Sequence, residues 1–289
     1  MKVFCAIVIF FLLCFMALAS FPGLSEKFDD PTRLGGTIHI ISTNGVTLRW
    51  VEKRASTNAM FDLVFVHGTP GGAGVWAAQF RSPFPGANLF AYDRPGFGGS
   101  KPSEKKPHLQ EQAAALSMFI GCIATNRVVL VGHSYGSPVA LLTALEFPDK
   151  VSGVLLIGGD VDPALEKPLW IQYLFNWRCT SWLLPRPLRQ CNRELLSVRA
   201  DLAELQRKIP TLTVPVVMLH GGKDPLVPVA NVDWLRAQLA AAGKTNLFAA
   251  MVMPEYNHFI PWEHPDAVAA ALHNLTGLIQ TDPAQGRNK

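Results

Sequence analysis

Residues 128–136 have the sequence Val-Val-Leu-Val-Gly-His-Ser-Tyr-Gly, which combines a strand pattern, a sharp turn and the start of a helix. The four leading residues are apolar and mostly β-branched, as is typical of a buried strand in a parallel sheet. The segment after the turn, residues 137–145, is apolar and alanine-rich and predicts a helix. This stretch is therefore predicted to form a strand–turn–helix unit with a serine at the turn.

The turn has the pattern Gly-x-Ser-x-Gly, formed by Gly132, Ser134 and Gly136. Bulkier side chains at positions 132 and 136 would clash with a serine on so sharp a turn. A serine in this place has an exposed hydroxyl close to backbone N–H groups at the start of a helix. Ser134 is therefore the candidate nucleophile. The alternative is a glycine-rich turn that arose by chance.

Strand and helix patterns alternate over most of the chain. Strands are expected at residues 37–41, 46–51, 61–66, 88–92, 128–131, 151–157, 215–220 and 247–253, and helices at 109–123, 137–145, 229–242 and 265–279. The first two strands flank Asn44-Gly45, which is typical of a tight hairpin. The order predicts an α/β fold, with a mostly parallel central sheet flanked by helices. Ligands of such sheets bind at the carboxyl ends of the strands, where the glycine-rich turns lie.

The alternation stops between residues 163 and 209, where five aromatic residues occur: Trp170, Tyr173, Phe175, Trp177 and Trp182. An insertion of this kind between two strands is expected to form a helical lid over the site. A second small domain or a surface that touches a membrane is the alternative. The predicted organisation is a core of residues 36–162 and 210–281 with a lid at 163–209, preceded by a linker at 21–35 and followed by a flexible tail at 282–289.

Residues 1–20 have a pattern of their own. Lys2 is followed by residues 3–19, which carry no charge, and alanines stand at positions 17 and 19. This is typical of a secretory signal peptide cleaved after Ala19. The run also reaches the lower limit of a membrane span, so an uncleaved anchor that associates with a membrane through residues 3–19 is the rival interpretation. The protein is expected to be exported, whether periplasmic or secreted, or anchored to a membrane.

Charge and cysteine content limit the partners. The net charge is +4 with no dense run of Lys or Arg, so no nucleic-acid partner is expected. Cys122 is expected to be a small buried residue, and Cys179 could pair with Cys191 in an oxidising compartment. No Cys/His spacing is typical of a metal site. The sequence does not predict an oligomeric state.

A serine nucleophile needs a base that accepts its proton. His258 is the candidate base because it lies in a loop between the last strand and the last helix. The base needs a carboxylate to orient it, and Asp224, after the strand at 215–220, is the candidate acid. Asp160 and Asp162, after the strand at 151–157, are rival acids.

Over residues 36–281 the chain resembles the α/β-hydrolase fold superfamily, in its lidded serine hydrolase branch. The resemblance depends on the order Ser134, Asp224, His258 and on three motifs: His67-Gly68-Thr69-Pro70-Gly71-Gly72, Asp93-Arg94-Pro95-Gly96-Phe97-Gly98-Gly99-Ser100, and Gly132-His133-Ser134-Tyr135-Gly136. It implies that the backbone N–H groups of Thr69 and Tyr135 form an oxyanion hole. His67, Gly68, Gly132 and Gly136 would then support the turns around it.

The resemblance implies two-step acyl transfer on a small-molecule substrate with an acyl or carbonyl group, most simply by a carboxylesterase or lipase-like enzyme. Neither a metal nor an organic cofactor is expected, because this acyl-transfer chemistry needs none. A serine nucleophile separates the chain from the haloalkane dehalogenase and epoxide hydrolase branches. The turn at residues 67–72 is similar to that of proline iminopeptidases, but Asp93-Arg94-Pro95-Gly96 departs from their Asp-Gln-Arg-Gly. The alternatives are amide or aminopeptidase activity, C–C bond hydrolysis, perhydrolysis, and a binding protein without turnover.

Overall fold

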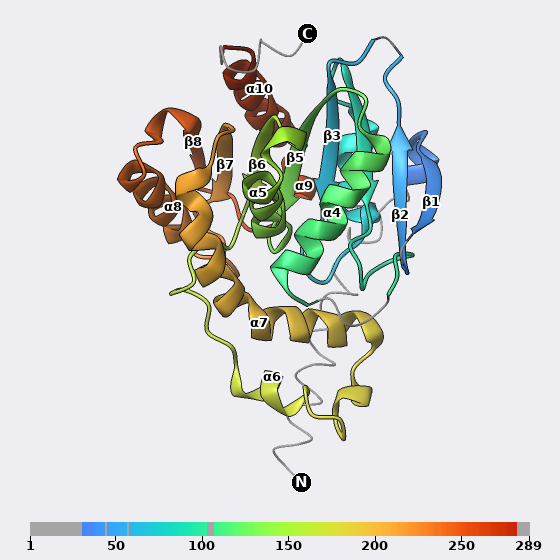
Figure 1. Ribbon diagram of the computed structural model, residues 1–289, viewed down its shortest axis with the longest axis vertical. Coiled ribbons are helices and arrows are strands. Elements are labelled where there is room, and N and C mark those ends of the chain that lie inside the picture. The colour runs from blue at the N-terminus through green and yellow to red at the C-terminus, as the bar shows by residue number, and fades with distance from the viewer. Residues whose placement is uncertain (1–30, 44, 57, 103–106, 282–289) are drawn as a thin grey trace.

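The computed structural model describes residues 31–43, 45–56, 58–102 and 107–281, and its centre is an eight-stranded sheet between two layers of helices (Figure 1). The predicted leader at 1–20, most of the linker at 21–35 and the tail at 282–289 lie outside these residues. Among the helices of the described residues, none combines the length and the apolar character needed to cross a bilayer.

The sheet is mostly parallel, as predicted. Its strands are β1 (Thr37–Thr43), β2 (Val46–Lys53), β3 (Phe61–Val66), β4 (Ala87–Tyr92), β5 (Arg127–His133), β6 (Gly153–Ile157), β7 (Val216–Gly221) and β8 (Phe248–Met253). They are ordered β1-β2-β4-β3-β5-β6-β7-β8. β1 pairs antiparallel with β2, and β2 with β4, while all later pairs are parallel. The predicted hairpin forms, although its turn residue Asn44 lies outside the described residues.

Helices follow the strands at the predicted places. The α-helices are α3 (Ala77–Arg81), α4 (Leu109–Ile123), α5 (Gly136–Glu146), α6 (Trp170–Leu174), α7 (Arg186–Lys208), α8 (Ala230–Ala241), α9 (Ile260–Glu263) and α10 (Pro265–Thr281). Short 3-10 helices are η1 (Pro31–Leu34), η2 (Ala73–Trp76), η3 (Pro148–Lys150), η4 (Ser181–Leu183), η5 (Ile209–Thr211) and η6 (Thr245–Leu247). The four helices predicted from sequence correspond to α4, α5, α8 and α10.

Two hydrophobic cores lie on opposite faces of the sheet, and β3 shows how one strand serves both. All of its residues are buried. Val64 and Val66 pack toward α4, α5, α7 and α8, whereas Leu63 and Phe65 pack toward α3, α9 and α10. Successive side chains of a strand point to opposite faces, so a run without polar alternation is what a strand covered on both sides requires.

The insertion at residues 163–209 is helical, and its two parts differ. Val198, Leu202 and Leu205 of α7 are buried in the same core as α4 and α5. Residues 169–183, which include α6 and η4, carry several exposed apolar side chains. In Figure 1, α7 runs across one end of the sheet and α6 lies beyond it. That the insertion covers the site as a lid stays a prediction.

The expected burial of Cys122 was wrong, and the pairing of Cys179 with Cys191, which the sequence left open, is not formed. Cys122, Cys179 and Cys191 are all free thiols. Cys179 is exposed, whereas Cys191 on α7 has its thiol directed to Thr69 in the interior. Cys122 is exposed rather than buried, as is its neighbour Gly121 in the last turn of α4.

Candidate active site

Ser134 lies on a strained turn between β5 and α5. It is the one non-glycine residue in the described parts of the chain with a left-handed backbone, at φ 53°. This conformation is costly for a residue with a side chain, and it persists only where the surroundings enforce it. The Ser134 N–H donates to the carbonyl of Ile157 at 2.9 Å, and the Ser134 carbonyl accepts from Ser137 N–H at 2.8 Å. The turn is therefore fixed to the end of β6 on one side and to α5 on the other.

Glycines at three positions allow the backbone to close around Ser134. A Cβ atom at position 132 would lie 2.4 Å from the Gly136 carbonyl oxygen, and one at position 136 would lie 2.1 Å from the Val66 carbonyl oxygen. A Cβ atom at position 68 would lie 2.8 Å from the Cβ of Ser134. Side chains at positions 132 and 136 would therefore clash, but with the backbone around the turn rather than with Ser134 itself, as the sequence had suggested. The close approach at Gly68 shows that the turn at residues 67–69 packs directly against Ser134.

Asp224 and His258 form a buried pair. The Nδ1 of His258 lies 2.7 Å from Oδ2 of Asp224, and their side chains are 5% and 1% exposed. Oδ1 of Asp224 accepts the N–H groups of Leu226 at 2.9 Å and Val227 at 2.8 Å. Burial by itself would raise the pKa of Asp224. The hydrogen bonds that the carboxylate accepts, of which the one from His258 has the largest effect, hold the pKa below its ordinary value. The carboxylate can therefore fix His258 with Nδ1–H as donor, which leaves Nε2 able to accept a proton.

His258 is held beside the turn that carries Ser134. Its ring centroid lies 4.8 Å from that of His133, and His133 Nε2–H donates to the His258 carbonyl at 3.0 Å. A Cβ atom on Gly158, at the end of β6, would lie 3.3 Å from His258 Nδ1. The ends of β5 and β6 and the loop after β8 therefore converge at this point. The His133 ring, to which the sequence pattern assigns no role, packs against the candidate base.

The two rival acids have other environments. Asp162 Oδ1 accepts the Ala164 N–H at 2.8 Å. Asp160 is 5% exposed, and burial together with the charge of Glu166 raises its pKa well above the ordinary range. A neutral acid is a poor partner for an imidazolium. His258 is thus paired with Asp224, as expected, rather than with either of them.

The predicted oxyanion donors, the N–H groups of Thr69 and Tyr135, follow β3 and β5. Among the described residues, the backbone hydrogen bonds of turns, loops and helix caps use neither N–H. Burial raises the pKa of the Cys191 thiol of α7 to about 12, a rise that the Thr69 hydroxyl opposes. Cys191 is a neighbour of the site that sequence reasoning missed, because it is 122 positions from Thr69 in the chain.

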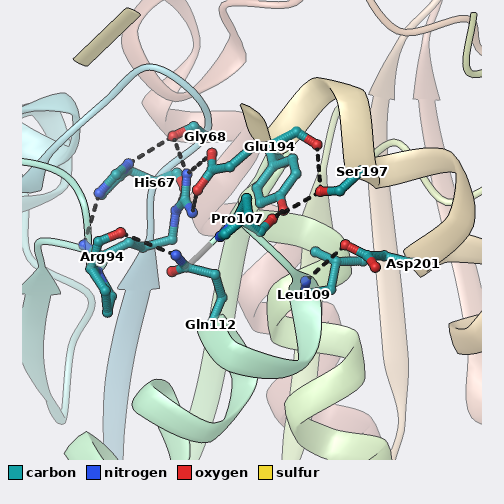
Figure 2. Close-up of polar contacts among 11 residues, drawn as sticks. His67, Gly68, Arg94, Pro107, Leu109, Gln112, Glu194, Ser197 and Asp201 are labelled. Carbon is teal, nitrogen blue, oxygen red and sulfur yellow. Dashed lines mark hydrogen bonds and ion pairs between the residues drawn. The ribbon is translucent and has the colours of Figure 1, made fainter. Parts of the chain in front are cut away.

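Arg94 fixes the turn at residues 67–69 (Figure 2). Its Nε donates to the His67 carbonyl at 2.9 Å, and its Nη2 donates to the Gly68 carbonyl at 3.0 Å. The Arg94 N–H also donates to His67 Nε2 at 3.0 Å, and the Nδ1–H of the same ring donates to Gly68 O at 2.7 Å. The backbone that presents Thr69 is therefore held by a side chain from the loop after β4.

The same guanidinium is bound to α7. Nη1 and Nη2 of Arg94 lie 2.8 Å and 3.1 Å from the two carboxylate oxygens of Glu194, and both side chains are 0% exposed. The guanidinium carbon also lies 4.9 Å from the ring centre of Tyr135, whose hydroxyl donates to the Pro107 carbonyl at 2.8 Å. The Ser197 hydroxyl donates to that carbonyl at 3.1 Å (Figure 2). Helix α7 is thus tied by polar groups to the turns that carry both predicted oxyanion donors.

Three buried histidines are expected to make stability depend on pH. Burial lowers the pKa of His67, of His220 and of His133, the last to about 3. Below about pH 6.5 the unfolded chain binds more protons at these positions than the folded chain does, so the free energy of unfolding should fall as the pH drops. Each histidine that stays neutral should contribute a loss of about 2 kcal/mol between pH 7.5 and 5. Asp160 opposes this trend, since its raised pKa lowers stability as the pH rises.

Guanidinium unfolding at pH 7.5, 6 and 5 measures this dependence. His133→Asn should reduce the slope of the free energy of unfolding against pH, whatever it does to the absolute stability. An unchanged slope in His133→Asn would contradict the lowered pKa of the His133 ring.

Groups of three or more His, Cys, Asp or Glu side chains that could hold a metal ion do not occur within the described residues. The absence of a metal or organic cofactor stays a prediction from the sequence.

The fold and the site define a class of protein. The family model described as "Alpha/beta hydrolase family" matches residues 63–271, a span that contains Thr69, Ser134, Asp224 and His258. The chain belongs to the alpha/beta hydrolase family.

Individual relatives are more distant. Protein ABHD8 of Mus musculus is 26% identical to this chain over 321 residues, and the match covers 93% of this chain and 70% of the mouse protein. The match to protein ABHD8 of Homo sapiens covers only 60% of the human protein. A 2-hydroxy-6-oxononadienedioate/2-hydroxy-6-oxononatrienedioate hydrolase of a Pseudomonas species is 24% identical, covering 84% of this chain and 93% of its own. Among solved structures, a bacterial membrane phospholipase A superimposes with a TM-score of 0.67 at 20% identity, covering 98% of this chain and 100% of the other. A likeness at this level shows the fold alone.

Proposed function

We propose that the protein is a serine hydrolase that cleaves esters of apolar acyl groups through an acyl-enzyme. The observation that carries the proposal is the buried His258–Asp224 pair at 2.7 Å beside the strained turn of Ser134. A strained serine, an oriented histidine and two backbone N–H groups that donate to no backbone carbonyl in the turns, loops and helix caps of the described residues are the parts that acyl transfer needs. A binding protein would have no use for a serine held in this conformation.

In the proposed mechanism, Ser134 Oγ attacks the ester carbonyl carbon while His258 Nε2 takes the hydroxyl proton. The carbonyl oxygen becomes an oxyanion that accepts hydrogen bonds from the N–H groups of Thr69 and Tyr135. Asp224 stabilises the imidazolium. His258 then gives its proton to the leaving alcohol as the C–O bond breaks. Water attacks the acyl-enzyme, His258 takes one of its protons, and the acid leaves as Ser134 recovers its hydrogen.

The charges around the turn at 67–69 favour an apolar substrate over a dianionic one. The Pseudomonas relative is named for a dioate, which is a substrate with two carboxylates. Arg94 lies beside the turn, but its guanidinium is occupied by Glu194 and by the carbonyls of His67 and Gly68. Since this cation is neutralised and 0% exposed, it is not available to a substrate carboxylate. Hydrolysis of an oxo-dioate by this chain is therefore the less favoured chemistry.

A panel of p-nitrophenyl esters from acetate to palmitate tests the proposal, run beside proline p-nitroanilide and a C–C bond substrate. We expect turnover of the esters alone, and a fluorophosphonate adduct on the peptide that contains Ser134. Labelling of Ser134 without ester turnover would transfer the assignment to one of the other hydrolytic reactions. A folded protein that neither turns over an ester nor reacts with the fluorophosphonate would be a binding protein, and the proposal would fail.

A further inference from the structure

The segment at residues 169–183 exposes an unusual amount of apolar surface. Six large apolar side chains in it are between 43% and 67% exposed: Leu169, Trp170, Tyr173, Trp177, Trp182 and Leu183. We call this segment the aromatic cap. It includes α6 and η4, and Figure 1 shows α6 beyond α7, on the side away from the sheet. Concentrated exposed apolar groups of this kind mark a site of interaction.

The aromatic cap has a defined conformation, because buried side chains on one side of it and hydrogen bonds hold it in place. Ile171 and Phe175 are buried, whereas Trp170 and Tyr173 project from the other side of the same short helix. Asn192 Nδ2 donates to the Gln172 carbonyl at 2.9 Å, which fastens α6 to α7. The Trp182 indole N–H donates to the Cys179 carbonyl at 2.9 Å. The exposure is therefore fixed by the fold.

The charge of the segment from Lys167 to Arg193 is of one sign, although Glu166 directly precedes it. Residues 167–193 contain five basic residues and no Asp or Glu: Lys167, Arg178, Arg186, Arg189 and Arg193. The acidic residue that follows, Glu194, is 0% exposed and paired with Arg94. A partner that covers the aromatic cap must therefore offer an apolar or interfacial environment to the indole rings and negative charge to the basic residues. A second copy of this segment would repel the first, since it carries the same sign.

We propose that the aromatic cap docks on the surface of an anionic lipid bilayer. Trp and Tyr side chains prefer the headgroup region of a membrane because one end of the ring is apolar and the other polar. Basic residues close by add attraction to anionic headgroups. The docking needs no catalytic step, so it stands independently of the ester hydrolysis proposed above.

Docking on the bilayer would also orient the candidate active site toward it. The cap is fastened to α7 by Asn192, and α7 is fastened to the 67–69 turn by Glu194 and Arg94. An acyl substrate dissolved in the membrane would then meet the protein on the side of Thr69.

Tryptophan quenching by vesicles with brominated acyl chains tests the docking. The protein is the full chain carrying Ser134→Ala, so that the result does not depend on turnover. Residues 1–30 contain no Trp, so any anchoring through residues 3–19 gives no signal of its own. We expect strong quenching by phosphatidylcholine vesicles that contain phosphatidylglycerol, and weaker quenching by phosphatidylcholine alone or at high salt.

Variants locate the quenched rings. Trp170→Phe, Trp177→Phe and Trp182→Phe should each remove part of the quenched emission, whereas Trp50→Phe, at a ring only 7% exposed on β2, should not. Reversing two exposed charges with Lys167→Glu and Arg178→Glu should raise the lipid concentration for half-maximal quenching by about 10-fold or more. The matched control, Arg236→Glu on α8 with Lys244→Glu in the turn after α8, should leave it unchanged.

Three outcomes would overturn the proposal. The first is an absence of tryptophan quenching, whether or not the protein floats with the vesicles in a density gradient. The second is quenching that survives replacement of all three cap tryptophans. The third is dimerisation of the chain that the three replacements abolish without any quenching in the wild type, which would assign the surface to a second copy.

Discussion

Replacing Ser134 by alanine should lower kcat for p-nitrophenyl ester hydrolysis by about 10⁵- to 10⁶-fold. The alanine removes the only atom that can form the acyl-enzyme, and the residual rate over water would come from the oxyanion donors and substrate binding alone. Asp224→Asn should lower kcat by about 10⁴-fold, because an amide at this place favours the wrong tautomer of His258. The double variant should be no slower than Ser134→Ala, since the two residues act as one unit.

Ser137→Ala is the matched control for these variants. Ser137 lies three residues after Ser134, and its hydroxyl donates to the Gly132 carbonyl at 3.0 Å. Its loss should change kcat by less than about 10-fold, because a single neutral hydrogen bond has a small net effect. An unchanged rate in Ser134→Ala would show that another residue, or a contaminating esterase, accounts for the activity.

The elements of the fold could be predicted because their sequence signals are local. Strands such as β3 and β5 are apolar runs of the right length, and the glycines at 132 and 136 follow from the steric needs of one turn. The choice among acids was harder. Asp160 and Asp224 both follow the ends of neighbouring strands, β6 and β7. The path of the loop after β8 decides which carboxylate meets His258. A single sequence indicates this path only through the order Ser134, Asp224, His258 along the chain.

The features that sequence reasoning missed depend on distant contacts. Cys122 was expected to be buried from its residue type, but the side of α4 on which it lies is decided by packing. The sequence motifs include His67 and His133 without indicating what their rings do, yet each ring binds a backbone carbonyl within the site. Arg94 and Glu194 lie 100 positions apart, and charged residues in a sequence indicate surface far more often than core.

Replacing Glu194 by alanine should lower the free energy of unfolding by about 3–5 kcal/mol. The change leaves the Arg94 guanidinium buried with no carboxylate to balance it, and burial of an unpaired charge is among the costliest effects of a single substitution. The melting temperature should fall by about 10 °C, as calorimetry or circular dichroism would show. The control is Glu204→Ala, which removes the exposed partner of Arg207 farther along α7 and should cost less than about 1 kcal/mol.

The double variant Arg94→Met with Glu194→Leu separates the charge balance of the pair from its positioning role. Removal of both charges should recover much of the stability, because an apolar pair avoids the desolvation of two ions. It should not recover activity, since the carbonyls of His67 and Gly68 lose the donors that hold the turn before Thr69. We expect kcat to stay at least about 10-fold low, with KM changed less, because a misplaced oxyanion donor weakens binding of the transition state more than binding of the substrate. Full activity in a stable double variant would show that Arg94 serves the fold alone.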